Sequence, residues 1–432
     1  MPQAASSRPP LVRSVSRWQL VGLSINDVVG SGVYLLPAAA AALLGATSVW
    51  AVILAGFAVG LLVLCFAEAS SYFDEPGAGY LYTREAFGPF IGFEVGWMTW
   101  LARIASVASL SNGLALATAY LWPGAAAGWP RAAIITGTLV LLTWVNVLGV
   151  KEGARTAVVL VVAKMLPLLF FAGVGLFFVD WTRVAAFAAP PPGVLGEAAL
   201  LLLFAYAGFE NTPAAAGEYK NPRRDVPFAM LAMILIVTSV YTVVQVVALG
   251  TLPGLAESRS PLAEAAGGFA GGWAALLLTV GAIVSIVGNV SNTTLMGPRY
   301  LFALARDGFG PTVFSRVHPV YRTPAIAIVT QSAVALALAL SGSFVGLAML
   351  SIVARLTTYI GTAAAVPVLR RRFGHQENAV RLPGGPLIPI AAVLVSLAFL
   401  MSATPQNLLA GAVALAAGAL IYTFRRSPGG RG

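Results

Sequence analysis

The chain has one cysteine and two histidines among its 432 residues, and this scarcity excludes several kinds of site. A single cysteine, Cys65, cannot form an intrachain disulfide. Together with His318 and His375, it offers too few ligands for a histidine–cysteine metal centre. Both histidines also lie in basic segments without clustered acids, so we expect no metal ion, no cofactor and no enzyme active site.

Nucleotide-binding and targeting signals are absent as well. No G-x-x-x-x-G-K-[ST] motif occurs, and none of the three lysines follows a glycine, so we do not expect this chain alone to drive transport with ATP. Its first seventeen residues are polar and basic and lack the short apolar core of a signal peptide.

Charged residues make up only 10% of the chain, whereas 58% are hydrophobic and the mean hydropathy is +0.85. A soluble protein of this length could not cover so much apolar surface with so few charges. Apolar runs of about 20 residues, the length that crosses a bilayer as a helix, recur along most of the sequence. We therefore predict an all-α polytopic membrane protein embedded in the lipid bilayer. Its twelve transmembrane helices are expected at 17–37, 47–70, 89–121, 131–149, 154–179, 194–217, 227–250, 272–305, 324–341, 344–369, 386–403 and 406–424.

The net charge of +10 could suggest a nucleic-acid partner, but the positions of the basic residues indicate membrane orientation instead. Of the 26 lysines and arginines, three lie well inside expected helices; when residues near a helix end are counted with the adjoining loop, three lie on one side and 20 on the other. The three in the sparse loops are Arg131, Arg183 and Arg259. The positive-inside rule therefore predicts a cell (inner) membrane protein with both termini in the cytoplasm and no nucleic-acid partner. No pattern in the sequence predicts an oligomeric state.

Two of the expected helices contain residues that weaken a helix, and they lie five helices apart. The first reads NDVVGSGVYLLP at residues 26–37, and the second reads LFAYAGFENTP at residues 203–213. Paired interruptions of this kind indicate the central binding site of a transporter. A helix that restarts after Gly30 presents free N–H groups to an anion, and the carbonyl groups before it can accept from an ammonium group. Together they suit a zwitterion; the alternative is that small residues merely let two helices pack closely.

Four blocks of the sequence follow one another in a recognisable order and spacing. They are GSGVYLLP (30–37), PGAGYLYTREAFGPFIGFEVGW (76–97), FAYAGFENTPAAAGEYKNPRRDVP (204–227) and PRYLFALARDGFGP (298–311). With these blocks, residues 17–372 resemble the amino acid–polyamine–organocation (APC) superfamily of secondary transporters. The resemblance implies the leucine-transporter fold, with inverted repeats at 17–180 and 194–372 and helices 1 and 6 unwound at mid-membrane. It also implies two peripheral helices within 386–424 and cytoplasmic tails at 1–16 and 425–432.

The resemblance further implies how an amino acid substrate is held. Its α-carboxylate would meet the backbone N–H groups of Ser31 and Gly32 beside Gly30, and its α-amine the carbonyl groups of Val28 and of residues near Phe204 and Ala207. The ring of Phe204 would act as a gate over the substrate. Thr293 stands where arginine/agmatine antiporters carry a tryptophan, which argues against an arginine-type substrate. The small or medium residues expected at the pocket are Leu110, Ala205, Ala207 and Thr293, which favours a neutral amino acid.

Lys164 lies about ten residues into its expected helix, which is roughly 15 Å deep at 1.5 Å per residue. Charges at that depth are costly and mark ion or substrate paths. In sodium-independent relatives, a lysine in this stretch takes the place of a coupling sodium between the first and eighth helices. A desolvated ammonium can exchange a proton near neutral pH, so Lys164 is our candidate for proton coupling. The alternative is a permanently charged lysine that pins the fifth helix to the first.

Further ionisable residues accompany the two interruptions. Asp27 and Glu210 either take part in proton coupling or neutralise buried cations. Arg103 falls on a stretch that lines the substrate pocket in the family, where it would bind a substrate side-chain carboxylate or pair with one of these acids. Arg355 is expected to be structural.

Two charged segments on the expected cytoplasmic side suggest an inner gate. Arg299 and Glu218 are the candidates for ion pairs that break when the site opens inward; Arg223 and Asp307 lie in the same segments. The alternative is that these charges only anchor the loops on the cytoplasmic side.

These features together predict a secondary active transporter that carries a neutral amino acid with protons by alternating access. The alternative is an amino acid or amine antiporter of the arginine/agmatine type. Sodium coupling is least expected, because Lys164 would compete for the position of the ion.

Overall fold

The computed structural model describes residues 16–73, 77–149, 154–184, 189–376 and 379–424, without the side chains of 154–160 and 214–218. Throughout these residues the chain forms helices and no strand, so the prediction of an all-α protein is confirmed. The tail 425–432 and nearly all of the tail 1–16 lie outside the described residues.

The α-helices follow the apolar runs, and short 3-10 helices occur where the chain turns. The elements used below are α1 (Arg17–Val28), α2 (Ser31–Leu44), η1 (Gly45–Ser48), α3 (Val49–Ser71), α4 (Ala78–Phe87), α5 (Pro89–Thr118), α6 (Gly128–Leu148), α7 (Ala154–Gly175), α8 (Pro192–Tyr206), η5 (Phe209–Glu218), α9 (Pro222–Thr251), α10 (Pro261–Ala270), α11 (Gly272–Arg306), α12 (Ala325–Ser341), α13 (Phe344–Phe373), α14 (Leu387–Met401) and α15 (Pro405–Thr423).

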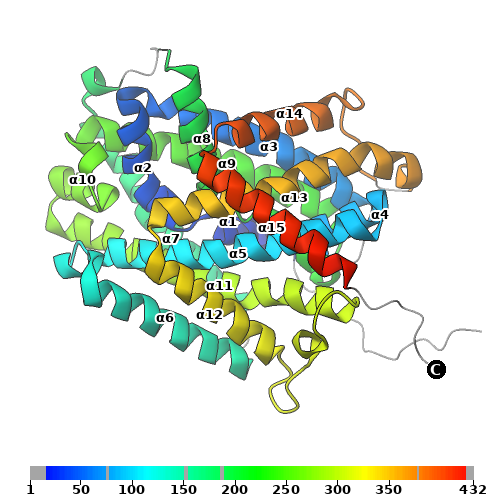
Figure 1. Ribbon diagram of the computed structural model, residues 1–432. Coiled ribbons are helices and arrows are strands. Elements are labelled where there is room, and N and C mark those ends of the chain that lie inside the picture. The colour runs from blue at the N-terminus through cyan, green and yellow to red at the C-terminus, as the bar shows by residue number, and fades with distance from the viewer. Residues whose placement is uncertain (1–15, 74–76, 150–153, 185–188, 377–378, 425–432) are drawn as a thin grey trace, which may run out of the picture.

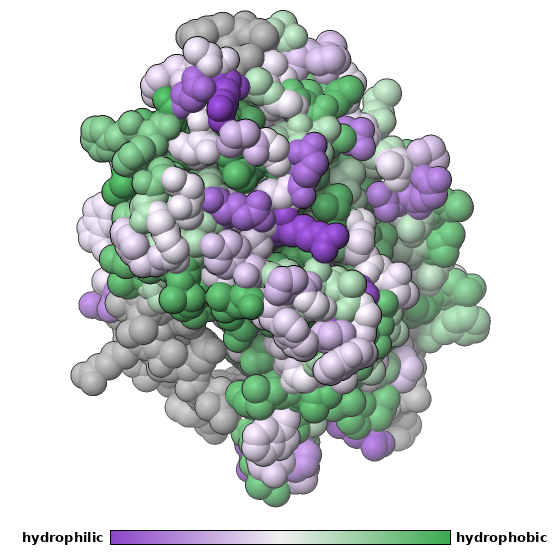
Figure 2. Space-filling model, turned by 90° about the vertical axis from the view of Figure 1, so that its left-hand side faces the viewer, coloured by the Kyte–Doolittle hydropathy of each residue, from purple (hydrophilic) through white to green (hydrophobic). Residues whose placement is uncertain are grey.

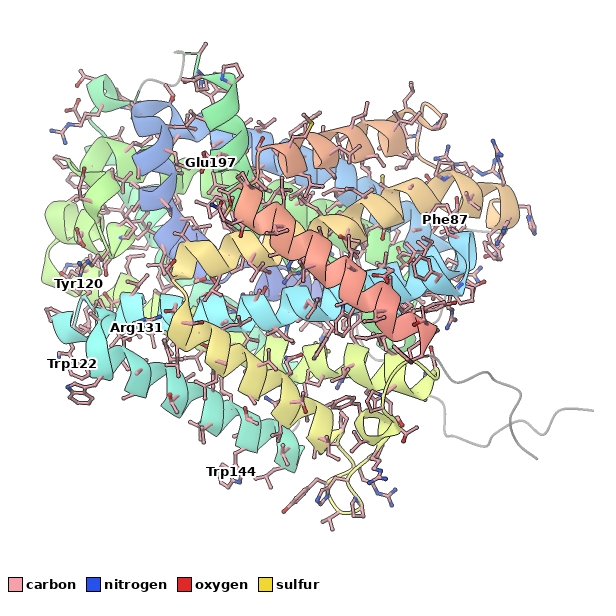
Figure 3. All side chains as sticks on the ribbon, in the orientation of Figure 1. Phe87, Tyr120, Trp122, Arg131, Trp144 and Glu197 are labelled. Carbon is pink, nitrogen blue, oxygen red and sulfur yellow. The ribbon has the colours of Figure 1, made fainter. Side chains whose placement is uncertain are left out.

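Eight helical stretches among the described residues are long and apolar enough to cross a membrane. One of them, Ser31–Ser71, contains α2, η1 and α3, and two shorter apolar helices are α12 and α14. Figure 2 looks onto the end of the bundle where α2 and α10 lie, and shows hydrophilic side chains clustered at its middle with hydrophobic ones along the flanks. Exposed aromatic residues lie toward both ends, with Tyr120 and Trp122 at one and Phe87 toward the other (Figure 3). This distribution is typical of a polytopic membrane protein.

Helix α5 lies at the centre of the bundle and packs against α11, α12 and α13 (Figure 1). A second group, in which α3 packs against α8 and α9, contacts both interrupted segments, since α9 packs against α1 and α8 packs against α2. The last helix, α15, crosses the front of α5 and α13 in Figure 1 and is mostly exposed. The centre of the bundle is thus formed by helices that are far apart in sequence.

The first expected span is broken into α1 and α2. Helix α1 ends at Val28, and Gly30 precedes α2 with a non-helical backbone (φ −134°, ψ −143°). The Val29 carbonyl oxygen, released from helical bonding, accepts a hydrogen bond from Ser285 Oγ at 3.1 Å. The break leaves glycines at positions where α8 and α11 approach closely, since a Cβ on Gly32 would lie 2.5 Å from Ala205 Cα.

The second interruption follows α8 and touches the first. Ala207 is extended, and Gly208 has a φ of +129°, which a residue with a Cβ rarely adopts. A Cβ on Gly208 would also lie 2.5 Å from the Asp27 carbonyl oxygen at the end of α1. After Gly208 the chain continues as the 3-10 helix η5, so the expected span 194–217 is interrupted within the segment 203–213 that the sequence indicated. Pro213 within η5 lacks the N–H group that an α-helix would need.

Most other helix bounds agree with the expected ranges to within a few residues; 272–305, for example, is observed as Gly272–Arg306. Two helices were not predicted. Helix α4 lies in a loop on one side, and α10 lies in a loop on the other. Both carry local signals, because Pro261 stands at the first position of α10, and Gly88 and Gly271 follow the last residues of α4 and α10.

Two arginines join helix ends that lie far apart in sequence. Arg131 of α6 donates to Asn112 Oδ1 of α5 at 2.6 Å (Nη2) and 2.9 Å (Nε). It also donates to the carbonyl oxygens of Ala339 in the last turn of α12 (2.8 Å) and of Gly342 just after that helix (2.6 Å). Figure 3 shows Arg131 at the same end as Tyr120 and Trp122. Arg370 binds the buried Glu68 of α3 through two hydrogen bonds of 2.6 Å.

Candidate functional site

A cavity lies where the two interruptions meet. It is lined by the end of α1, the start of α2, the segment between α8 and η5, and the facing sides of α5, α11 and α13. Its lining residues are Asp27, Val28, Gly30, Ser31, Gly32, Arg103, Ser106, Leu110, Phe204, Ala207, Gly208, Asn211, Asn289, Asn292, Thr293 and Arg355.

Nearly all of the residues expected at the substrate line this one cavity. They are Val28, Gly30, Ser31, Gly32, Arg103, Phe204, Ala207 and Thr293. Ala205 does not line it. Its backbone packs against Gly32, and its carbonyl oxygen accepts a hydrogen bond from Tyr241 Oη at 3.0 Å. Ala205 therefore shapes the contact between α2 and α8 rather than the cavity wall.

Six lining residues were not expected there: Ser106, Gly208, Asn211, Asn289, Asn292 and Arg355. The spacing of polar residues within the helices could have indicated some of these lining residues from the sequence. Asn289, Asn292 and Thr293 are spaced i, i+3 and i+4 in an otherwise apolar helix, which places them on one face. Ser106 likewise follows Arg103 by one turn of α5.

The start of α2 offers unsatisfied donors to the cavity. Its N-cap, Gly30, provides no side-chain hydrogen bond to the first N–H groups of the helix. Ser31 is completely buried, and its hydroxyl has no hydrogen-bond partner among the described residues. Free N–H groups at a helix N-terminus form a ready site for an anionic group such as a carboxylate.

The end of α1 offers acceptors and a negative charge. Asp27 lines the cavity, and its Oδ1 atom accepts a hydrogen bond from Asn292 Nδ2 at 2.8 Å. Val28 lines the cavity beside it, one residue before the interruption. A carboxylate and backbone carbonyl groups at a helix C-terminus favour a cation such as an ammonium group.

Lys164 joins α7 to the interrupted helix and to α11. It is completely buried, and its Nζ atom donates to the Asn26 carbonyl oxygen at 2.9 Å and to Asn289 Oδ1 at 3.0 Å. Asn289 itself lines the cavity. The lysine thus contacts both the first and the eighth expected helices, and it reaches the cavity wall through its partner Asn289.

Three ionisable side chains form an arginine–glutamate cluster, defined by Arg103, Glu210 and Arg355. Glu210 Oε1 faces both guanidinium groups, with Arg103 Nη2 at 3.7 Å and Arg355 Nη1 in direct contact. Glu210 Oε2 accepts from the Gly208 N–H at 3.0 Å and from Tyr359 Oη at 3.3 Å. All three cluster residues are at most 5% exposed. Arg103 therefore pairs with Glu210, which was one of its two expected outcomes.

The cluster is tied to neighbouring helices by neutral partners. Arg103 Nη2 donates to Asn211 Oδ1, and Arg355 Nη2 donates to Ser106 Oγ at 2.8 Å. Arg103 and Arg355 both line the cavity as well. Arg355, which the sequence suggested to be structural, thus forms an ion pair and also lines the cavity.

An aromatic pair borders the cavity near the start of α13. The ring of Phe204 meets that of Phe344 edge to face, with centroids 6.1 Å apart. Phe204 is the residue expected to gate the substrate.

The pairing of Arg299 with Glu218 at an inner gate stays a prediction, because the side chain of Glu218 lies outside the described residues. Arg299 is exposed, and its Nη1 atom lies 3.2 Å from Met296 Sδ. Arg17 at the start of α1 forms an ion pair of 3.3 Å with Asp225 of α9, next to an edge-to-face contact between Trp18 and Phe228.

The fold and the cavity define a multi-pass helical membrane protein with a cavity, lined by charged residues, at two helix interruptions. Comparison with known proteins identifies the group: a profile of the amino acid permease family matches residues 15–424. The chain therefore belongs to the amino acid permease family, a group of transporters within the APC superfamily.

Three Bacillus subtilis (strain 168) proteins are similar to the chain. It is 29% identical to the methylthioribose transporter and 28% identical to the branched-chain amino acid permease BcaP, in each case over 97% of the chain and 94% of the relative. It is 31% identical to the serine/threonine exchanger SteT over 86% of both chains. The relatives are transporters with different cargoes.

Proposed function

We propose that the chain is a secondary active amino acid transporter that works by alternating access, with proton-coupled symport as its mode. The observation that carries this proposal is the cavity at the junction of two helix interruptions, which combines free donors at α2 with acceptors at α1. The proposal includes the leucine-transporter fold with twelve transmembrane helices, inverted repeats at 17–180 and 194–372, peripheral helices within 386–424 and cytoplasmic termini.

The backbone of the substrate would span the interruption. We place the α-carboxylate at the N–H groups of Ser31 and Gly32, and the α-amine beside Asp27 and the Val28 carbonyl group. Phe204 and Ala207 line the cavity from the second interruption, where further carbonyl groups are available. Opposite charges on the amino acid thereby meet opposite ends of two helices.

Proton coupling would use Lys164 together with Asp27 and Glu210. Lys164 touches the end of α1, so a change in its charge alters the force that holds α1 against α11. The inner contact between Arg17 and Asp225 would break when α1 moves to release the substrate. Arg299 and Glu218 stay candidates for the same gate.

An exchanger is the second candidate. The two hydrogen bonds of Lys164 also suit a permanently charged lysine that fixes helix geometry without exchanging a proton. One similar protein is named as a serine/threonine exchanger. In an exchanger, the protein would switch the cavity from one side of the membrane to the other only when a substrate is bound.

Uptake into proteoliposomes separates the two modes. A panel of radiolabelled amino acids is offered to empty and preloaded vesicles, with and without an inward pH gradient, for wild type and Lys164→Ala. Accumulation in empty vesicles that follows the pH gradient and is lost in the variant supports symport. Uptake confined to preloaded vesicles and indifferent to pH makes the protein an exchanger and Lys164 a structural residue. Absence of uptake for every amino acid under all conditions contradicts amino acid transport.

A further inference from the structure

We propose that the substrate is a dicarboxylic amino acid of the length of glutamate, whose side-chain carboxylate binds Arg103 and Arg355. The inference rests on the proposed transport function and names the substrate class of that site. It replaces the neutral side chain that the sizes of the pocket residues suggested.

The first observation is a surplus of positive charge in the arginine–glutamate cluster. Two guanidinium groups share a single carboxylate, Glu210, and all three side chains are buried. The nearby Lys164 and Asp27 balance each other in charge. Among the described residues, Asp27 is the only acid that lines the cavity. A zwitterion of net charge zero leaves the surplus in place, whereas a substrate of net charge −1 cancels it, and uncompensated buried charge is costly.

The second observation is that Glu210 does not take up all donors of the two guanidinium groups. Arg355 Nε and Nη2 donate to the neutral hydroxyl groups of Ser351 at 3.4 Å and Ser106 at 2.8 Å. Each guanidinium group can bind one carboxylate bidentately, yet both approach the same oxygen atom, Glu210 Oε1. The Nε group of Arg103 is buried and has no hydrogen-bond partner among the described residues. Because both arginines line the cavity, a carboxylate entering it meets donors that Glu210 does not occupy.

The third observation is the separation between the two carboxylate sites. A Cβ on Gly113 of α5 would lie 3.1 Å from Ser31 Cβ, so Gly113 marks the level of the α-carboxylate site. Ser106, which accepts from Arg355, lies seven residues earlier on α5, which is about 10 Å at 1.5 Å per residue. An extended five-carbon dicarboxylate, with carboxyl carbons roughly 5 Å apart, bridges donors about 10–12 Å apart. Aspartate is one bond shorter and fits less well.

Glutamate and glutamine provide the decisive comparison, because they share a carbon chain and differ in charge. Both are offered as radiolabelled substrates to proteoliposomes preloaded with the same unlabelled compound under an inward pH gradient, so that symport and exchange are both permitted. Leucine and aspartate complete the panel. We expect uptake of glutamate to exceed that of glutamine by at least about tenfold, which corresponds to ~1.4 kcal/mol.

Charge variants test the assignment to the cluster. Arg103→Gln reduces the surplus to zero, and Glu210→Gln raises it. Binding of glutamate and glutamine to purified protein is measured by calorimetry. We expect the ratio of the two affinities to fall about tenfold in Arg103→Gln and to rise in Glu210→Gln. Arg355→Gln is the second variant if Arg103→Gln does not fold. Arg183→Gln, an exposed residue with the same change in charge, is the matched control and should behave like wild type.

The outcomes separate the two proposals. If glutamine or leucine is taken up, and glutamate is neither taken up nor competes with them, the dicarboxylate inference is wrong. The proposed transport function is unaffected by that result. Uptake of no amino acid overturns both. Preference for glutamate that is unchanged in Arg103→Gln and Arg355→Gln overturns the assignment of the side-chain carboxylate to the cluster.

Discussion

Replacing Gly32 with alanine tests whether α2 and α8 pack backbone against backbone at the cavity. The added Cβ would lie 2.5 Å from Ala205 Cα and 2.6 Å from Ala205 Cβ, whereas carbon atoms in contact keep about 3.5–4.0 Å. Alanine has no side-chain rotamer that could relieve the overlap, so one helix must shift by about 1 Å. We expect the free energy of unfolding to fall by about 1–3 kcal/mol, the usual cost of overpacking.

The same shift should impair transport, because it displaces the N–H groups of Ser31 and Gly32. Losing one hydrogen bond to a charged group weakens binding by roughly 1.5–3 kcal/mol, so we expect uptake at low substrate concentration to fall by about tenfold or more. Gly22→Ala in α1 is the matched control, since no heavy atom lies within 4 Å of its added Cβ. Thermal unfolding in detergent and proteoliposome uptake are compared for both variants. If Gly32→Ala melts and transports like Gly22→Ala, the close contact of α2 with α8 is wrong.

Two further predictions concern regions outside the cavity. Arg131→Gln should lower the free energy of unfolding by roughly 1.5–3 kcal/mol, because Arg131 joins α5, α6 and α12, whereas Arg183→Gln should change it little; equal melting temperatures would contradict this role. Burial, followed by the hydrogen bond to Asp307, raises the pKa of Tyr80 to about 12. Since the unfolded residue titrates near pH 10, the Tyr80 contribution to stability is complete below about pH 10 and is lost as pH rises toward 12. Tyr80→Phe should therefore lose less stability than wild type over this range in thermal unfolding.

The two interruptions could be predicted from sequence because their causes are local. Glycine and serine at residues 30–32, and Gly208 with Pro213, weaken a helix within a few residues of themselves. The structure accordingly ends α1 at Val28 and α8 at Tyr206. Most of the residues expected at the substrate belong to these same segments and line the cavity.

Partners that come from distant helices could not be predicted in the same way. Arg103 left two outcomes open, and only the packing of α5 beside α13 and the second interruption shows that it meets Glu210. Arg355 seemed structural because nothing in its neighbourhood in sequence indicates Ser106, which lies 249 residues away. The carbonyl group of Asn26 as a partner of Lys164 likewise depends on how α7 crosses α1. Such contacts are properties of the tertiary arrangement.

On the two proposals above, the arginine–glutamate cluster links substrate and proton through one oxygen atom. Glu210 Oε1 faces both guanidinium groups, so a proton on Glu210 weakens its attraction for them and leaves their donors to a substrate carboxylate. Conversely, a carboxylate bound to Arg103 and Arg355 offsets part of the positive charge that faces Glu210. Because linkage is reciprocal, an anionic substrate and a proton then favour each other's binding. The second arginine, which gives the cluster its surplus positive charge, would thus both select a dicarboxylate and couple its transport to protons. Glu210 would carry the proton alongside Lys164.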